Sequence, residues 1–237
     1  HGVPPFDQIK EEHYSPAIIK SIGLAKDEIQ AIINNTEAPT FENTIVALAN
    51  AGEQLGTVSA VFFNMLSANT NDKLQSIAQE VSPALSQYQD DIYLNEQLFA
   101  KVKAVYEQKA SLDLNTEQKT LLEKTYKDFV RSGANLNTEE KARLRKINET
   151  LSLRNLKFND NVLKDINSYV LYIDDTNKLK GLPASVIEAA HETAKEKGED
   201  KKWAFTLSNA SVMNFLQYAE NRELRKEIWN AYQNIGK

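Results

Sequence analysis

The spacing of the apolar residues is the strongest constraint on how this sequence can fold, because they return every three or four positions along much of it. On the first such stretch, one side of a helix would carry Ile18, Ile22, Ala25, Ile29 and Ile32. Residues that interrupt helices are scarce, with eight glycines and six prolines among 237 residues. This pattern argues against a β-sandwich or barrel and predicts a mainly α fold.

The same spacing predicts a series of helices joined by short polar segments. Pro16 suits the first turn of the first helix, which should end near the polar segment 34–39. A longer helix from about 42 to 67 should pair with it as an antiparallel hairpin. We interpret Gly52 and Gly56 on that helix as points of close packing. The next helices are predicted at about 72–90, with a kink or break at Pro83, and at about 95–110.

Two similar phrases, LNTEQK at 114–119 and LNTEEK at 136–141, mark helix starts. Each places an asparagine at the N-cap, with Gln118 or Glu140 three residues later, which is the spacing of a capping box. The second phrase opens the longest helix, at about 138–165. One side of that helix would carry Leu144, Ile147, Leu151, Phe158 and Val162.

After the long helix the sequence predicts a small β structure. Residues 169–173 (YVLYI) and 203–207 (WAFTL) are rich in β-branched and aromatic side chains, with a helix at about 184–197 between them. The predicted fold class is therefore mainly α, with antiparallel helical hairpins, long helices and one small two-stranded β accessory. The chain is interpreted as one helical domain, which subdivides into an all-helical part at 1–167 and a mixed part at 168–237.

Composition excludes several kinds of function. The formal charge is −5, and lysines and arginines are interspersed with acidic residues, so we expect no basic face and no nucleic-acid partner. The absence of cysteine removes thiol nucleophiles, disulfides and cysteine-based metal sites. Since no run approaches the roughly 20 apolar residues of a membrane helix, no membrane span is predicted.

Histidines are too few for most histidine-built sites, because only His1, His13 and His191 exist. A zinc peptidase helix places two histidines four residues apart, but Lys195 occupies that position after His191. Glu188 and His191 form a Glu-x-x-His pair of the kind found in di-iron bundles, yet the second copy that such a site needs is absent.

The short acidic clusters Asp90-Asp91 and Glu11-Glu12-His13 are interpreted as surface charge. The sequence has neither a Gly-x-Ser-x-Gly turn nor the clustered glycines of a phosphate loop. Taken alone, the residues predict a helical domain with no catalytic group and no metal ligand of its own.

Several phrases, spread over essentially the whole chain, resemble one family. In the same order, they resemble segments of the bacterial branch of the thimet-oligopeptidase-like zinc peptidases, the peptidyl-dipeptidases (dipeptidyl carboxypeptidases) and oligopeptidases A. The phrases are PPFDQI at 4–9, EHYSPA at 12–17, APTFENT at 38–44, KGLP at 180–183 and YAENRELR at 218–225.

The resemblance implies a zinc metallopeptidase that hydrolyses short, unstructured peptides, either by releasing C-terminal dipeptides or by internal cleavage, since the groups that would distinguish the two activities are not in this chain. In this family the zinc site is a His-Glu-x-x-His helix with a downstream glutamate, and these elements belong to the part after Tyr232. No catalytic or metal residue is therefore carried over to this chain, and no substrate-binding residue is assigned. Zinc is expected in the full-length protein, whereas this N-terminal region would wall the substrate channel and be inactive alone.

The end of the chain is interpreted as a junction with the missing catalytic domain. A helical segment breaks at Asn221, and the helix that follows carries Leu224, Ile228 and Tyr232 on one side. We expect that side to be partly exposed or paired with another copy. The chain starts at His1 without a methionine, so the resemblance leaves two compartments open in a bacterium, the cytoplasm and the periplasm, where the protein could be a lipoprotein.

The alternative is a stand-alone helical binding or scaffold protein without peptidase activity. The encoding DNA beyond Lys237 distinguishes the two hypotheses. A stop codon there, with no His-Glu-x-x-His in frame, would favour the scaffold.

Overall fold

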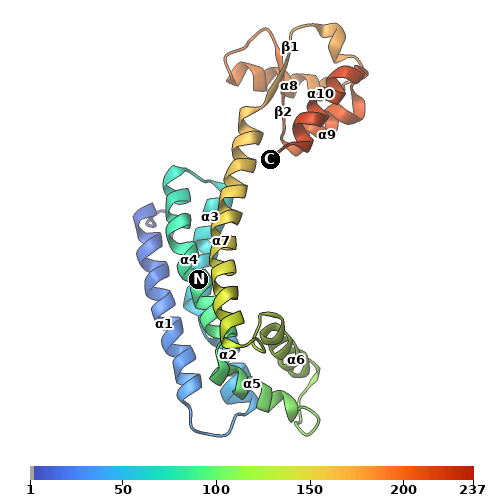
Figure 1. Cartoon of the computed structure of the whole chain (residues 1–237). Helices are drawn as coiled ribbons and strands as arrows, with labels where there is room; N and C mark the ends of the chain where they lie inside the picture. Colours follow the sequence, from blue (N-terminus) through green and yellow to red (C-terminus); the bar gives the residue numbers. More distant parts are fainter. Residues whose placement is uncertain (1–2) are drawn as a thin grey trace. The chain divides into compact units, whose positions relative to one another are not determined.

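The computed structural model describes residues 3–237 and shows a mainly helical chain with one two-stranded sheet (Figure 1). The predicted fold class is confirmed. The chain divides into two compact units, unit 1 up to Arg154 and unit 2 from Asn155 to Lys237. The division falls inside the long helix α7 (Thr138–Ser168), whereas the sequence changes in character only after that helix.

Unit 1 is built from helices joined by short loops. Its elements are the 3₁₀ turn η1 (Glu11–His13), α1 (Tyr14–Asn34), the π helix η2 (Phe41–Val46), α2 (Ala47–Asn50), α3 (Glu53–Ala68), α4 (Asp72–Tyr93), α5 (Glu96–Glu107), α6 (Thr116–Arg131) and the first half of α7.

Helices α1 and α3 form the antiparallel hairpin that the sequence predicts (Figure 1). The ring of Tyr14, at the start of α1, lies 5.2 Å from the ring of Phe62 near the end of α3. At the opposite end, the Glu28 carboxylate accepts a hydrogen bond of 2.7 Å from the backbone N–H of Gly52. The predicted apolar stripe of α1 is buried along its whole length, at Ile18, Ile22, Ala25, Ile29 and Ile32.

The prediction of one continuous helix over about 42–67 is wrong. The stretch consists of η2, then α2, which ends at Asn50, and then α3, which begins at Glu53. Between α2 and α3 the backbone turns at Gly52, whose φ of 79° lies in the left-handed region that glycine adopts at no steric cost. Helical spacing of apolar residues continues through such a turn, so periodicity alone did not reveal it.

The two glycines of this stretch differ in their surroundings. A Cβ at Gly52 would lie 3.1 Å from the Tyr88 hydroxyl oxygen and 3.6 Å from the Ala25 Cβ, which is the predicted close packing. A Cβ at Gly56 would meet nothing within 4 Å, so the prediction of close packing is wrong there.

Helix α4 runs parallel to α1. Ser15 donates a hydrogen bond of 2.7 Å to Glu80, and farther along both helices the Lys26 ammonium lies 2.9 Å from the Asp91 carboxylate. Pro83 lies inside α4 without ending it.

Helices α5 and α6 pack through aromatic rings. The rings of Tyr106 and Tyr126 stack with centroids 3.9 Å apart, and those of Phe99 and Phe129 with centroids 5.9 Å apart. These rings and neighbouring apolar side chains form one core with α1 and η2. Its fully or nearly fully buried members include Ile29, Ile32, Phe41, Ile45, Leu98, Val102, Leu122 and Phe129.

Both predicted capping boxes are confirmed. At the start of α6, the Asn115 side chain accepts a hydrogen bond of 2.9 Å from the Gln118 N–H, and the Gln118 side chain accepts one of 3.0 Å from the Asn115 N–H. Asn137 and Glu140 make the same reciprocal pair at the start of α7, at 2.9 and 3.0 Å.

Polar contacts hold the first half of α7 against α4. Asp90 accepts a hydrogen bond of 2.6 Å from the Asn148 side chain, and the Arg145 guanidinium lies 2.9 Å from Asp91. Asp90 is only 7% exposed, so its interpretation as surface charge is wrong. Burial raises the pKa of the Asp90 carboxyl, and the Asn148 hydrogen bond and the Arg145 charge oppose that shift.

The apolar side predicted for the long helix is only partly covered: Leu144 and Val162 are partly buried, and the other three residues are exposed. Ile147, Leu151 and Phe158 are 49%, 51% and 54% exposed. In the first half of α7 the side that meets α4 and the start of α5 is instead polar, because it carries Arg145, Asn148 and Lys141, whose ammonium lies 3.1 Å from the Glu96 carboxylate.

Unit 2 contains the sheet and three short helices. Strands β1 (Val170–Ile173) and β2 (Trp203–Thr206) pair antiparallel, with Val170 opposite Thr206 and Ile173 opposite Trp203, and both predicted strands are confirmed. The other elements are the second half of α7, the 3₁₀ turn η3 (Thr176–Leu179), α8 (Ala184–Glu196), α9 (Asn209–Tyr218) and α10 (Arg222–Gln233).

Helix α10 packs on the core of unit 2. The predicted break before it is confirmed, since the Asn221 side chain caps the helix by accepting a hydrogen bond of 3.1 Å from the Leu224 N–H. Ile228 is fully buried, and Leu224 and Tyr232 are partly buried against the same cluster. The side is therefore partly exposed, as one of the two expected outcomes has it, although Ile228 at its centre is fully buried within the chain. The exposed side carries Trp229, at 47%.

One stretch, Phe41–Ala68, is long and apolar enough to cross a membrane by length and composition alone, although the sequence predicts no span. This is weak evidence, because core helices of soluble proteins pass the same test. The turn at Gly52 interrupts the stretch.

Gly52→Ala and Gly56→Ala test the turn between α2 and α3. The first change forces a Cβ into the left-handed region and toward Tyr88, and should lower the free energy of unfolding by about 1–2 kcal/mol. The second places alanine inside a helix with free space around it, and should raise it by up to about 1 kcal/mol. Urea unfolding, monitored by circular dichroism, measures the change in unfolding free energy for each variant. Changes of the same sign would contradict the placement of Gly52 in a left-handed turn and of Gly56 inside a helix.

Asp90→Asn tests the buried carboxyl. With a raised pKa, the folded state binds more protons than the unfolded state, so stability falls as pH rises from the ordinary carboxyl pKa through the raised one. Asparagine still accepts the Asn148 hydrogen bond but carries no charge. It should therefore increase stability at pH 7 by about 0.5–1 kcal/mol and flatten the pH profile.

The matched control is Asp90→Leu, which leaves the Asn148 amide without its acceptor and should cost about 1–3 kcal/mol. Urea unfolding between pH 4 and 7.5 provides the comparison. Equal losses of unfolding free energy in Asp90→Asn and Asp90→Leu would show that the shape of the side chain, and not its charge, determines how residue 90 affects stability.

Candidate functional site

Unit 1 holds a cavity of about 520 Å³ bounded by α2, α3, α4 and α6. The helices bring together residues that lie far apart in the sequence. Residues from three of these helices give the cavity its character: Gly56, Ser59 and Phe63 from α3, Tyr88 and Tyr93 from α4, and Asp128 from α6.

The local fold explains why this space stays open. The turn at Gly52 lets α2 and α3 take separate paths, and Gly56 then presents no side chain where α3 borders the cavity. The walls are apolar, with aliphatic side chains such as Leu48, Leu85 and Leu121 beside the rings of Phe63 and Tyr93.

A few polar atoms stand among these apolar walls. The Ser59 hydroxyl is buried and has no hydrogen-bond partner among residues 3–237. Asp128, on α6, is partly buried, and within the described part of the chain its carboxylate makes neither an ion pair nor a hydrogen bond. The Ser59 oxygen has almost no accessible surface and so does not face the open space, whereas the partly exposed Asp128 carboxylate is available there to a ligand or water.

The electrostatic environment of the cavity is negative. Burial raises the pKa of the Tyr88 phenol, and the nearby Glu28 carboxylate raises it further. Burial also raises the pKa of the Tyr93 phenol, followed by the negative charge of Asp128. Both phenols stay protonated at neutral pH, and none of the side chains that line the cavity is a lysine, arginine or histidine.

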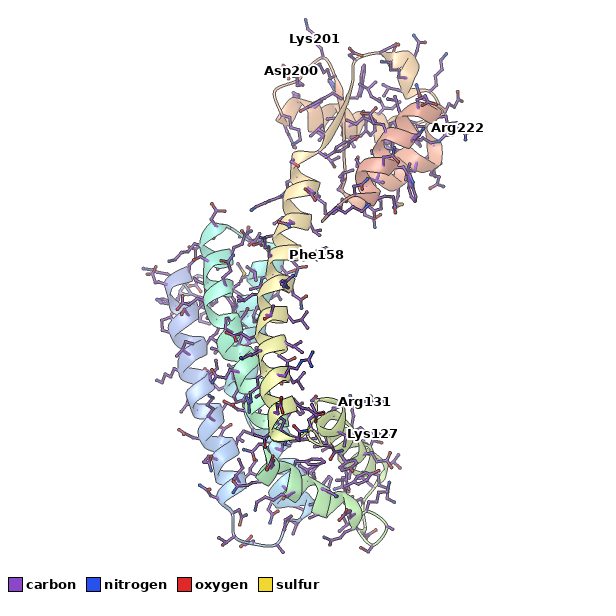
Figure 2. All side chains as sticks on the ribbon, in the orientation of Figure 1. Lys127, Arg131, Phe158, Asp200, Lys201 and Arg222 are labelled. Carbon is purple, nitrogen blue, oxygen red and sulfur yellow. The ribbon has the colours of Figure 1, made fainter. Side chains whose placement is uncertain are left out.

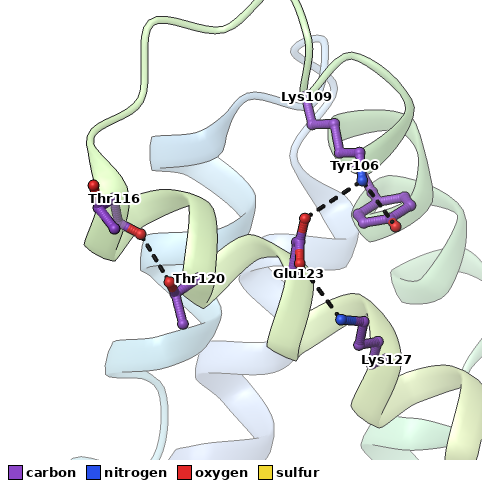
Figure 3. Close-up of polar contacts among 6 residues, drawn as sticks. All are labelled: Tyr106, Lys109, Thr116, Thr120, Glu123 and Lys127. Atoms are coloured by element: carbon purple, nitrogen blue, oxygen red, sulfur yellow. Dashed lines mark hydrogen bonds and ion pairs between the residues drawn. The ribbon is translucent and has the colours of Figure 1, made fainter.

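A second polar group, at the end of α5, is a structural contact. The Lys109 ammonium lies 4.4 Å from the centre of the Tyr106 ring and 3.5 Å from the Glu123 carboxylate, which also meets Lys127 at 3.4 Å (Figure 3). The three charged side chains are about half exposed, and such pairs contribute little in water. They join the loop after α5 to α6.

The histidine singled out in the sequence packs against the sheet. The His191 Nδ1 atom lies 3.2 Å from the Lys202 carbonyl oxygen, and its ring centre lies 6.1 Å from that of Trp203. Lys195 lies 3.9 Å from Glu192, and Glu188 is exposed.

The N-terminal cluster is also a structural feature. His13 accepts a hydrogen bond of 3.1 Å from the Lys10 N–H through Nδ1, and Glu11 accepts one of 2.6 Å from the Asn71 side chain. His1 lies outside the described residues. Between residues 3 and 237, no group of three or more histidine, aspartate or glutamate side chains is placed to hold a metal ion. The side chains present therefore do not fit a zinc site.

Exposed charges of both signs are mixed along the chain. Lys127 and Arg131 lie on α6, Asp200 and Lys201 lie side by side on the loop before β2, and Arg222 begins α10 (Figure 2). This distribution provides no argument for binding a phosphate backbone.

The sequence did not identify the cavity, although it marked three residues that border it for their packing, namely Ile29, Gly52 and Gly56. Ser59, Tyr88 and Asp128 come from three helices and share no motif. Gly56 was the one residue in the sequence that could have pointed to the cavity. Glycine destabilises the interior of a helix, so its presence there suggests that a side chain at that position would be unfavourable or would fill a functional space.

Comparison with known proteins shows relatives over nearly the whole chain, although no family model matches. The dipeptidyl carboxypeptidase of Salmonella typhimurium (strain LT2) is 38% identical over 231 residues, which cover 98% of this chain and 34% of that protein. The dipeptidyl carboxypeptidase of Escherichia coli (strain K12) is 38% identical over 96% of this chain and 34% of its own length. Oligopeptidase A of Haemophilus influenzae is 32% identical, with 98% and 34% covered.

This chain thus spans about a third of the length of the curated relatives it matches. The resemblance that its phrases indicate is confirmed: the chain is homologous, over nearly all its residues, to dipeptidyl carboxypeptidases and oligopeptidases A, which are peptidases of the thimet-oligopeptidase family.

Proposed function

We propose that this chain is the non-catalytic region of a zinc metallopeptidase that hydrolyses short peptides, and that it walls the channel through which they reach the catalytic site. The observation that carries the proposal is homology to peptidases over 98% of the chain. Identity is higher to the dipeptidyl carboxypeptidases, at 38%, than to the bacterial oligopeptidases A, at 27–32%. This difference favours release of C-terminal dipeptides.

The residues of this chain indicate which part of the protein would hold zinc and which would form the wall. Zinc in such an enzyme supplies a Lewis acid and an activated water. The described residues of this chain do not fit such a site, so we assign the zinc ligands to another part of the full-length protein. What this chain supplies is helical surface in two units, each packed on its own buried core, with side-chain caps at the starts of α6, α7 and α10. A channel wall built from such surface would restrict entry to flexible, short peptides.

A chimera tests this role. Residues 1–237 replace the homologous third of Escherichia coli dipeptidyl carboxypeptidase, and dipeptide release from N-blocked tripeptides is measured. Because the two chains are 38% identical over this third and a core tolerates apolar exchanges that keep its volume, we expect kcat/KM to stay within about a hundredfold of the parent enzyme.

The control is the same enzyme with that third deleted, which should be inactive because one wall of the channel is missing. Zinc content and size-exclusion chromatography establish that the chimera is folded. A folded, zinc-loaded chimera that cleaves no better than the deletion would contradict the proposal and favour a stand-alone binding protein.

A further inference from the structure

We infer that the cavity of unit 1 is a binding site for a cationic group on an aliphatic stem, an alkylammonium or alkylguanidinium such as the end of a lysine or arginine side chain. This inference goes beyond the proposed function, because it concerns equilibrium binding to this chain and requires no catalysis.

Charge is the first argument. Asp128 borders the cavity, is partly buried, and has no ion-pair or hydrogen-bond partner within residues 3–237. Glu28, behind Tyr88, already accepts the Gly52 N–H at 2.7 Å and adds negative charge to the same region. With no basic side chain among the lining residues, this charge is left for a ligand to neutralise. A cation complements the site, whereas an anion would be repelled.

The aromatic walls are the second argument. Phe63 and Tyr93 are partly exposed and line the same space as Asp128. The faces of aromatic rings attract ammonium and guanidinium groups, and the same rings pack against methylene groups. A ligand with a cationic head and an aliphatic stem can both be attracted to the rings and Asp128 and pack its methylene groups against the apolar walls. A hydrated inorganic cation provides the charge but no apolar surface to pack.

The cavity also offers hydrogen-bond acceptors. The partly exposed Tyr93 phenol lines it together with Asp128, whose charge raises the pKa of that phenol, so the two groups lie near each other. Both oxygens can accept hydrogen bonds from the N–H groups of an ammonium. Gly56 leaves the space on α3 open, since a Cβ there would meet nothing within 4 Å.

Two sources carry this chemistry: a basic side chain within a peptide, and a free alkylamine. The experiment titrates the ¹⁵N-labelled chain with a blocked Ala-Lys-Ala peptide, its norleucine counterpart and n-butylammonium, at constant ionic strength and pH 7. Norleucine keeps the stem and removes the charge. The readout is the Kd from amide chemical shifts of residues that border the cavity.

We expect the lysine peptide, butylammonium or both to bind at least about tenfold more tightly than the norleucine peptide. Binding of the peptide alone identifies a side chain as the source, and binding of butylammonium alone identifies a free amine. Asp128→Asn should weaken binding of the cation about tenfold while leaving the norleucine peptide unchanged.

A second pair of variants keeps the test independent of Asp128. Gly56→Leu should fill the cavity and abolish binding, whereas Gly56→Ala should fold at least as well as the parent chain and still bind. Equal affinity for lysine and norleucine, no binding of either cation, or cation binding that survives both Asp128→Asn and Gly56→Leu would overturn the inference. Loss of activity in the chimera described above would not affect this result, so the two proposals fail separately.

Discussion

The turn at Gly52 is the constraint on which the arrangement of unit 1 depends. Its left-handed backbone ends α2, and its N–H is held by Glu28 at 2.7 Å, which fixes the turn against α1. Before the turn, Phe41 and Ile45 join the core formed with α5 and α6; after it, Phe62 on α3 meets Tyr14 on α1. The stretch 41–68 therefore packs on α5 and α6 before the turn and on α1 after it. The cavity lies beside the turn between these two parts.

Much of the fold was predictable because it is determined locally. The caps at Asn115, Asn137 and Asn221 depend on side chains within three residues, and the strands depend on short runs of β-branched and aromatic residues. The turn at Gly52 was not predictable in this way, because helical periodicity continues through it. The burial of Asp90 was missed for a related reason, since it depends on Asn148 from a helix much later in the sequence.

The candidate site shows the limit of sequence reasoning more clearly. Counting residue types led to His191, which packs beside Trp203 and faces no second ligand among the described residues. The cavity instead combines a missing side chain at Gly56 with Tyr88 and Asp128 on other helices, a combination with no characteristic spacing. The resemblance identified relatives correctly but named no site residue, because the zinc-site motif that it implies has no counterpart in this sequence.

The central claim is that this chain supplies a folded wall and a binding cavity to a peptidase while the zinc chemistry belongs elsewhere in the protein. Equilibrium dialysis of the purified chain 1–237 against micromolar zinc, followed by metal analysis and a peptide-cleavage assay, tests it most directly. We predict no stoichiometric zinc and no dipeptide release from a folded chain. One tightly bound zinc per chain together with zinc-dependent cleavage would contradict the claim.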